Sequence, residues 1–310
     1  MAQKSCHFAR TGESHQLNGN TLPKTMKFAS VQSARFSTPG GAFSAHWPEY
    51  LMEAAELGIF MVSACFFTVL LFHPSSPAVA TIPSEFLRRL LTGVAMGATA
   101  IALVYSPLGA RSGAHFNPSV TLTFLRMGRI AGWDAFFYIC AQMVSSVLGV
   151  AVAGLILGPQ LRHPAVNYAV TVPGMNGLVS AGIAEFVIAF ILMTVVLNVS
   201  SRQELARFTG IAAGLLVATF ISLEAPLSGM SMNPARTFGS AFNAHLWTGI
   251  WMYLIVPPLA MLSAAELFLA VRQRAGCAKL NHAEGVRCIF CEYQDWKANR
   301  FEAPSLATAS

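Results

Sequence analysis

One short phrase occurs twice in this chain of 310 residues, and the repeat is the feature that most constrains the fold. The first copy, SGAHFNPS at residues 112–119, returns 116 positions later as SGMSMNPA at residues 228–235. Each copy leads into a short apolar segment compatible with a helix, Pro118–Met127 and Pro234–Phe242. Asparagine followed by proline suits the N-cap and first position of a helix, so each copy predicts a helix start.

The composition around this repeat is that of a membrane protein. Hydrophobic residues make up 54% of the chain and charged residues only 11%, with a mean hydropathy of +0.53. Soluble domains carry about 25% charged residues, and the deficit lies between Trp47 and Ala270. A spanning helix needs about 20 mostly apolar residues, more than either segment after the Asn-Pro pairs supplies. Both are therefore predicted to be re-entrant half-helices that line a cavity or are buried in protein.

Six other apolar segments are long enough to span a bilayer. They run from about Glu49 to Phe72, Phe86 to Tyr105, Trp133 to Leu157, Leu178 to Val199, Phe208 to Leu223 and Trp247 to Val271. An Ala-Glu pair marks the first and the fourth segment, at residues 55–56 and 184–185. Each half has three spans, so the second copy must enter the membrane in the opposite sense. The predicted fold class is an all-α membrane protein with six transmembrane helices, two re-entrant half-helices and an inverted repeat.

Three regions are expected along the chain. Residues 1–46 are predicted to be a disordered cytoplasmic tail, residues 47–274 the membrane domain, and residues 275–310 a cytoplasmic C-terminal tail. Most loop arginines and lysines are expected on the same side of the membrane as both termini, which predicts a cell-membrane protein with cytoplasmic termini. Arg88, Arg89 and Arg162 are expected on the outer side, and the pair Arg88-Arg89 runs against the trend. The net charge of +6 comes mainly from the flanks and short loops, where the basic residues are expected to set this topology. No nucleic-acid partner is predicted, because no basic stretch is interleaved with aromatic residues.

The Asn-Pro pairs are the first candidate site. It comprises Asn117, Pro118 and Ser119 in the first copy and Asn233, Pro234 and Ala235 in the second. Two ordinary helix caps would not predict a second copy with matched flanks, which favours a shared role. If the half-helices meet end to end, both positive dipole ends point at the bilayer midplane. Each asparagine amide can then donate a hydrogen bond to a passing oxygen, which predicts a passive channel for small neutral molecules that repels cations.

Arg236 is the second candidate, three residues after Asn233 and one turn into the second half-helix. A charged residue inside a membrane segment costs roughly 2.5–3.5 kcal/mol even on a mild insertion scale, which favours a functional role over a side chain that reaches the surface. Arg236 is predicted to form an outer constriction, where it donates to solute oxygens and repels cations and protons.

Further polar residues are expected to support the half-helices. Glu56 and Glu185, at matched places in the two halves, are predicted to accept hydrogen bonds from backbone N–H groups of the re-entrant loops. Glu53 competes with Glu56 for this role, although it lies nearer the membrane surface. Gln142 is expected to tether a loop, and His115 either lines a vestibule or packs a loop. The alternative for the two glutamates is proton coupling in an ion-coupled transporter.

These motifs resemble those of the aquaporin family, the major intrinsic proteins. The resemblance covers about residues 47–270 and rests on SGAHFNPSVT at 112–121, MNPARTFGSA at 232–241, Ala-Glu-Phe at 184–186 and Ala-Gln at 141–142. It implies six tilted spans, a homotetramer with one pore in each subunit, and passive two-way flow of water and small neutral solutes across the lipid bilayer. Neither enzyme activity nor a cofactor is predicted, because no catalytic constellation or phosphate-binding loop stands out.

The resemblance also implies an outer filter of four positions. Three of them fall on Ile221, Met230 and Arg236, and the fourth on Met96 or Gly97. Water-dedicated members resemble one another in having a histidine where this chain has Ile221, so the filter here is expected to be more apolar. Water is the expected permeant. A facilitator for glycerol, urea, ammonia or a metalloid hydroxide is the alternative.

The C-terminal tail contains one metal-like pattern. Cys277, His282, Cys288 and Cys291 are close in sequence, and Cys288-x-x-Cys291 is the fragment most typical of a zinc site. The spacing from Cys277 to His282 matches no standard finger. We therefore expect an unstructured tail without a metal, with zinc binding as the alternative.

Overall fold

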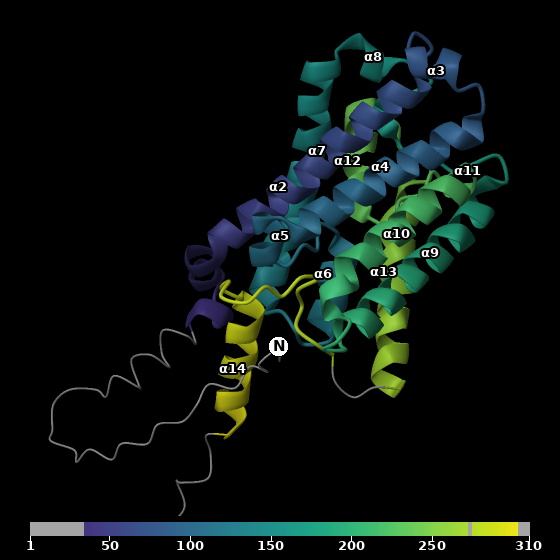
Figure 1. Ribbon diagram of the computed structural model, residues 1–310. Helices are drawn as coiled ribbons and strands as arrows, with labels where there is room; N and C mark the ends of the chain where they lie inside the picture. The colour runs from purple at the N-terminus through teal and green to yellow at the C-terminus, as the bar shows by residue number, and fades with distance from the viewer. Residues whose placement is uncertain (1–33, 272–274, 303–310) are drawn as a thin grey trace, which may run out of the picture.

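The computed structural model describes residues 34–271 and 275–302, and the described residues form helices without any strand. Six helices are long and apolar enough to cross a membrane (Figure 1). They are α2 (Pro39–Phe72), α4 (Glu85–Tyr105), α7 (Gly132–Leu157), α9 (Gly177–Ser200), α10 (Thr209–Leu223) together with the 3-10 turn η2 (Ala206–Phe208) that leads into it, and α13 (Ile250–Val271). The short helices α6 (Pro118–Arg126) and α12 (Pro234–Ala244) follow the two Asn-Pro pairs. The predicted fold class is therefore confirmed.

The first spanning helix is longer than the sequence predicted. Helix α2 begins at Pro39, where Thr38 Oγ1 caps it by accepting a hydrogen bond from Gly41 N at 3.1 Å. Residues 39–46 are thus helical, which corrects the expectation of a disordered tail up to residue 46; residues 1–33 lie outside the described part. The extension is anchored on α7, because the buried His46 ring lies 2.8 Å from the Asp134 carboxylate.

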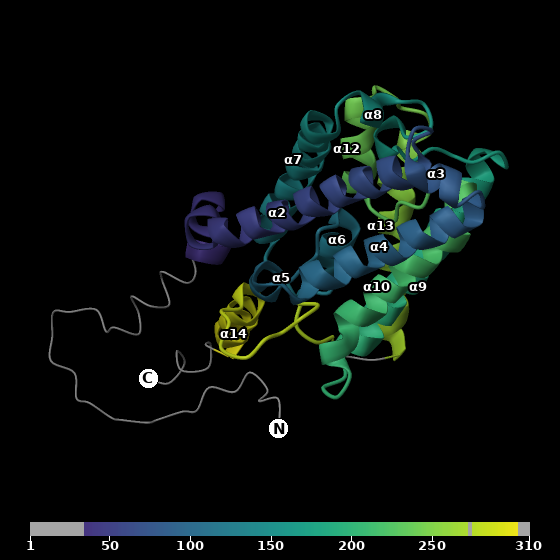
Figure 2. The same ribbon diagram turned by 45° about the horizontal axis from the view of Figure 1, so that its top comes forward.

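The helices pack with the two-fold pattern that an inverted repeat requires. Helix α2 packs on α7 in the first half, α9 packs on α13 in the second, and the equivalent helices α4 and α10 pack on each other. The half-helices cross over, since α6 packs on α13 and α12 packs on α7. Figure 2 shows both half-helices enclosed among the long helices. This exchange between the halves brings the N-termini of α6 and α12 together.

Helices α4 and α10 approach each other through small residues. A Cβ atom on Gly97 would lie 2.5 Å from the Gly214 carbonyl oxygen, and one on Gly93 would lie 2.4 Å from the Ala218 carbonyl oxygen. Small residues at a crossing let two membrane helices pack backbone against backbone. Gly97 consequently lies in the contact between α4 and α10.

Short helices mark the two ends of the bundle. At one end α14 (Ile289–Glu302) lies beside the bundle, and we call this the terminal end. At the opposite, far end lie α3 (Pro77–Thr81) and α8 (Pro159–Arg162) (Figures 1 and 2). Two further short helices, α5 (Pro107–Ser112) and α11 (Ala225–Ser228), lead into the first and second re-entrant loops.

Candidate functional site

Each half-helix is capped by the asparagine of its Asn-Pro pair. Asn117 Oδ1 accepts a hydrogen bond from Ser119 N at 2.8 Å, and Asn233 Oδ1 accepts one from Ala235 N at 3.1 Å. Pro118 and Pro234 occupy the first helical position, where a missing N–H costs nothing. The positive ends of both helix dipoles are therefore directed at the place where the two loops meet.

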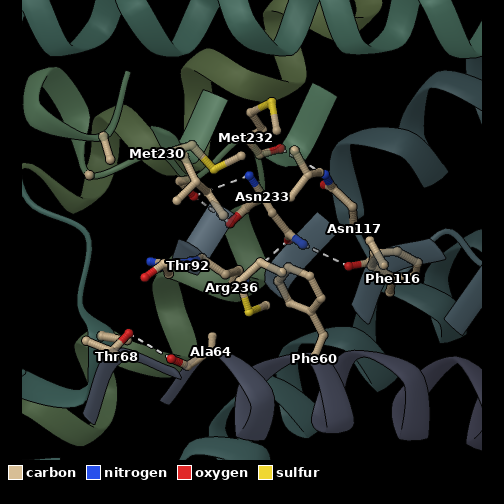
Figure 3. A pocket seen from close by; sticks show the side chains of 18 of the residues that line it. Phe60, Ala64, Thr68, Thr92, Phe116, Asn117, Met230, Met232, Asn233 and Arg236 are labelled. Atoms are coloured by element: carbon tan, nitrogen blue, oxygen red, sulfur yellow. Dashed lines mark hydrogen bonds between the residues drawn. The ribbon is translucent and has the colours of Figure 1, made fainter. Parts of the chain in front are cut away.

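The two asparagines also join the loops to each other. Asn117 Nδ2 donates to the Met232 carbonyl oxygen at 2.8 Å, and Asn233 Nδ2 donates to the Phe116 carbonyl oxygen at 2.8 Å. This reciprocal pair of bonds, drawn in part in Figure 3, was not predicted from the sequence. An amide carries two N–H donors, so each asparagine keeps a second donor after it has bound the opposite loop. Both residues line the cavity described below.

The two re-entrant loops share the same unusual backbone. Residues at equivalent places have positive φ angles, as follows: Gly113 and Gly229 (104° and 80°), Ala114 and Met230 (57° and 53°), Phe116 and Met232 (28° and 53°). Positive φ is uncommon for residues other than glycine and costs about 1–3 kcal/mol each, so it persists only where the surroundings enforce it. Each loop consequently needs firm support from the helices around it.

Tyrosine and serine give both loops the same support. Tyr138 on α7 donates its hydroxyl to the Ser112 carbonyl oxygen at 2.6 Å, and Tyr253 on α13 donates to the Ser228 carbonyl oxygen. The serine hydroxyls accept from the backbone two residues on, at 3.0 Å in the first loop and 3.1 Å in the second. The sequence analysis missed the tyrosines. Their matched places in the third helix of each half could have revealed them.

Glu185 on α9 holds the second loop. Its fully buried carboxylate accepts hydrogen bonds from Ser231 N at 2.7 Å, from Met232 N at 2.7 Å and from the Ser228 hydroxyl at 2.6 Å. These three donors are buried where water does not reach them, so the carboxylate supplies the hydrogen-bond acceptor that water would supply at the surface. The position of Glu185 matches the backbone-supporting role predicted for it.

Two glutamates share this work in the first half. Glu53 on α2 accepts hydrogen bonds from Phe116 N and, at 2.8 Å, from Gln142 Nε2. Glu56 reaches only the Ser112 hydroxyl, at 3.1 Å. The sequence analysis assigned the backbone contact to Glu56 and placed Glu53 nearer the surface; in the structure both are fully buried and the contact belongs to Glu53. The reason is geometric, since Glu53 is one helical turn closer to the terminal end.

Gln142 and His115 complete the support of the first loop. Gln142 Nε2 also donates to Thr121 Oγ1 at 3.1 Å, which ties α7 to the half-helix α6. The His115 ring lies with Nδ1 3.1 Å from Thr121 Oγ1 and Nε2 2.6 Å from the Ala278 carbonyl oxygen. Of its two expected roles His115 meets both in part, because it lines the cavity and is only 2% exposed within the packed loop.

The C-terminal segment folds against the terminal end of the bundle. Lys279 Nζ donates to the Ala110 carbonyl oxygen at 2.6 Å, and Gln294 Nε2 donates to the Gly128 carbonyl oxygen at 2.7 Å. Hydrogen bonds to Glu292 raise the pKa of Arg287 above its usual range. Residues 275–302 are thus ordered, which corrects the expectation of an unstructured tail. Backbone carbonyl groups of the bundle hold them in place, and the sequence gives no sign of these distant contacts.

A cavity of about 590 Å³ passes the meeting point of the loops (Figure 3). Its lining extends from Glu85 and Arg89 at the far end to Leu280 in the C-terminal segment at the terminal end. Asn117 and Asn233 both contribute to the wall between these ends. The cavity therefore leads past both capped helix N-termini.

Four of the five expected filter residues line this cavity. They are Met96, Ile221, Met230 and Arg236. Gly97 does not, because it faces the α4–α10 contact, so of the two residues between which the sequence left the choice open, Met96 is the one that lines the cavity. Among the residues described, Arg236 Nη1 is a buried nitrogen without a hydrogen-bond partner, a donor that a molecule in the cavity could use.

One face of α4 supplies a row of lining residues that the sequence analysis missed. They are Glu85, Arg89, Thr92, Ala100 and Val104, together with the expected Met96. Their spacing of three or four residues places them on one side of the helix. Figure 3 also shows Phe60, Ala64 and Thr68 of α2 directed at the cavity. Thr92 lies one helical turn before Met96, and this spacing is a signal that could have identified the face.

Half-helices that meet N-terminus to N-terminus around a cavity, inside six apolar helices, define a membrane channel and not an enzyme. A family model described as "Major intrinsic protein" matches residues 47–267. The chain belongs to this family, the aquaporins, as its motifs indicated.

Individual relatives agree with this assignment. The chain is 36% identical over 183 residues to a probable NIP-type aquaporin of Nicotiana alata, covering 58% of this chain and 64% of that protein. It is 33% identical over 211 residues to aquaporin NIP1-2 of Arabidopsis thaliana, covering 66% and 71%. The X-ray structure of the aquaglyceroporin from Plasmodium falciparum has a similar fold, with a TM-score of 0.58 and 17% identity over 71% of this chain and 94% of that one.

Proposed function

We propose that the protein is a passive channel for water that also admits small neutral solutes. Membership of the aquaporin family supports passive conduction. The observation that carries the proposal is the pair of asparagines at the junction of α6 and α12. Each holds the opposite loop with one N–H group and keeps the other for an oxygen in the cavity.

Ion exclusion follows from the charges around this junction. Both half-helices direct positive dipole ends at it, and Arg236 adds a full positive charge to the wall. A cation or proton that enters the cavity meets a positive potential, whereas a neutral hydroxyl accepts hydrogen bonds; this is the exclusion known for aquaporin-type channels. The buried glutamates serve the loops, which favours a channel over a proton-coupled transporter.

The wall around Arg236 favours solutes other than water as well. Ile221, Met230 and Met96 present apolar surface at the positions assigned to the filter. An apolar wall opposite an arginine suits a molecule with one polar and one less polar face, and methionine adapts its shape. Glycerol, urea or a metalloid hydroxide are the solutes that this filter would admit.

We extend the proposal to the assembly. Residues 47–274 form the channel unit of a homotetramer in the cell membrane, with both termini in the cytoplasm. The outer helix faces support a lipid or subunit environment, because large apolar residues such as Leu155, Ile156 and Val179 are exposed there. The prevalence of arginine in loops on the side of the termini supports the orientation.

Liposomes test the channel directly. The purified full-length protein is reconstituted, and vesicle shrinkage is followed by stopped-flow light scattering under gradients of an impermeant osmolyte, then of glycerol and of urea. Water permeability well above that of empty vesicles is expected, without dependence on a proton gradient. Permeability equal to that of empty vesicles would refute a water channel, and proton-driven flux would favour a transporter.

The filter assignment has its own test. Ile221→His adds a polar wall opposite Arg236 and is expected to lower glycerol and urea permeability relative to water. Ile221→Val is the matched control, because it keeps the wall apolar and is expected to leave the ratio unchanged. Equal ratios in both variants would contradict the placement of Ile221 in the filter.

A further inference from the structure

Four side chains outside the pore come together in the C-terminal segment. Cys277, His282, Cys288 and Cys291 each offer one ligand atom, and these atoms all lie within 4.8 Å of one another. Cys277 Sγ is 3.4 Å from Cys288 Sγ and 3.8 Å from Cys291 Sγ, and His282 Nε2 is 3.4 Å from Cys291 Sγ. Within the described part of the chain, none of these three cysteines is joined in a disulfide. The channel function described above uses none of the four residues.

These separations match the edges of a zinc tetrahedron. Zinc binds cysteine sulfur at about 2.3 Å and histidine nitrogen at about 2.05 Å, so the edges of an ideal site measure about 3.8 Å between sulfurs and about 3.6 Å between sulfur and nitrogen. Three of the six edges can be compared: the two S–S separations, 3.4 and 3.8 Å, and the S–N separation, 3.4 Å, lie close to these values, and the others are no longer than 4.8 Å. Three cysteines and one histidine also form a complete ligand set for a structural zinc.

The surroundings favour a negatively charged cluster. Cys288 directly precedes α14 and Cys291 lies in its first turn, where the helix dipole stabilises thiolates. Lys279 is only 3% exposed and donates to the carbonyl oxygens of Ala110 and Arg287, yet no carboxylate of the described residues forms an ion pair with it. Three thiolates around Zn²⁺ carry a net charge of −1, which would balance this buried ammonium group.

We propose that Cys277, His282, Cys288 and Cys291 bind one Zn²⁺ ion, which clamps the C-terminal segment across the terminal end of the pore. The ion joins the loop at residues 277–282 to the start of α14. Both of these elements touch the first re-entrant loop, so the zinc fixes them on it together.

The contacts of the two elements show what the clamp would hold. In the loop, Leu280 N donates to the Gly113 carbonyl oxygen at 3.0 Å, and the Leu280 side chain lines the cavity. In α14, the Phe290 ring stacks on His115 with centroids 5.5 Å apart. A Cβ atom on Gly113 would lie 2.7 Å from the Phe290 ring, so this ring packs directly on the loop backbone. The zinc site is thus separated from the cavity by the residues that line it and pack on the first loop.

The test measures metal in the full-length protein. The chain is produced in zinc-supplemented cells and purified in detergent with a thiol reductant, and its metals are quantified by mass spectrometry. We expect about one zinc per subunit in the wild type and less than about one tenth of that in Cys288→Ser. Cys140→Ser is the matched control, because Cys140 is an exposed thiol on α7 far from the cluster in sequence, and it should keep the full zinc content.

A second pair of variants separates ligation from folding. His282→Cys preserves four ligands and should retain zinc, whereas His282→Ala should lose it; both are compared only as monodisperse protein on gel filtration. Replacement of the zinc by Co²⁺ should give the visible absorption of tetrahedral cobalt thiolate. Absence of zinc from the wild type, equal zinc in Cys288→Ser, or a disulfide among the three cysteines in thiol titration would each overturn the site. None of these readouts depends on transport.

Discussion

The two re-entrant loops are built alike but are supported from different places. Both have positive φ angles at the same three places, and both have a serine and a tyrosine contact at equivalent positions. The second loop is supported within the bundle, by Glu185 and by Thr171, whose hydroxyl lies 2.8 Å from that of Thr237 on α12. The first loop relies in addition on the C-terminal segment, through His115 and Leu280. Among the residues that the structure describes, the C-terminal segment therefore supports the first loop and not the second.

The two half-helices also differ in the residues that they contribute to the cavity wall. Three residues after its asparagine, the first half-helix has Val120 and the second has Arg236, and both line the cavity. The second half thus supplies the charge of the proposed filter, while the first half is in contact with the proposed zinc clamp. Duplication gives the shared loop geometry, and under the proposals above the unmatched residues of the second half serve selectivity while those of the first half attach the tail.

The largest effect is expected from the glutamates. Glu185→Ala leaves three buried donors without an acceptor, at about 1–3 kcal/mol each, so most of the folded protein should be lost. Glu56→Ala removes a single contact, with Ser112, and should cost far less. Thermal unfolding followed by gel filtration in detergent measures both, with Glu266→Ala, on an exposed surface ion pair, as the control. Equal losses for Glu185 and Glu56 would contradict the division of labour in the first half.

Making the second half-helix resemble the first should change selectivity. Arg236→Val introduces the residue type of Val120 and is expected to raise glycerol permeability on the order of tenfold and to admit protons, because the positive charge of the filter is gone. Stopped-flow scattering and a pH-sensitive dye inside liposomes measure these changes. Arg202→Val, in an exposed loop, removes the same charge elsewhere and should behave as wild type. An unchanged glycerol permeability in Arg236→Val would remove Arg236 from the filter.

Removing the metal should loosen only the first loop's outer support. With Cys288→Ser or after chelation, trypsin should cut within residues 275–302 several-fold faster, since metal binding and folding of such segments are coupled. Release of Leu280 from the cavity should also raise water permeability by about twofold, as for an apolar constriction. Cys140→Ser serves as the control in both assays. Cleavage at the wild-type rate would show that the tail is held without the ion.

The smallest effects are expected from the two matched threonines. Thr121→Val removes hydroxyl contacts with Gln142 and His115, and Thr237→Val removes those with Thr171 and Ser231. Each should lower stability by about 2 kcal/mol, because each variant loses two contacts and a hydrogen bond contributes about 1 kcal/mol net. The thermal midpoint in detergent is the measurement. If one of the two variants lost as much stability as Glu185→Ala and the other did not, the two loops would be supported unequally at this position.

Local chemistry explains which predictions the structure agrees with. Both half-helices begin at the predicted prolines, because an Asn-Pro pair encodes a helix start within a few residues. The ends of most spanning helices also follow from runs of apolar residues bounded by glycine, proline or polar residues. The start of α2 does not, since residues 39–46 are stabilised by Asp134, which is 88 positions away from His46. A contact of that range leaves no local signal.

The sequence by itself determined the repeat, the inverted topology and the residues at the pore junction, because duplication and helix-start chemistry are written in neighbouring residues. Tertiary structure alone decided that Met96 and not Gly97 faces the cavity, that Glu53 takes the backbone contact expected of Glu56, and that four scattered ligands in the tail converge. The physical reason is common to these cases. In each of them the packing of segments that are distant in the sequence settles which side chain reaches a given site; for Met96 and Gly97 that packing selects between neighbours whose directions on the helix differ by about 100°.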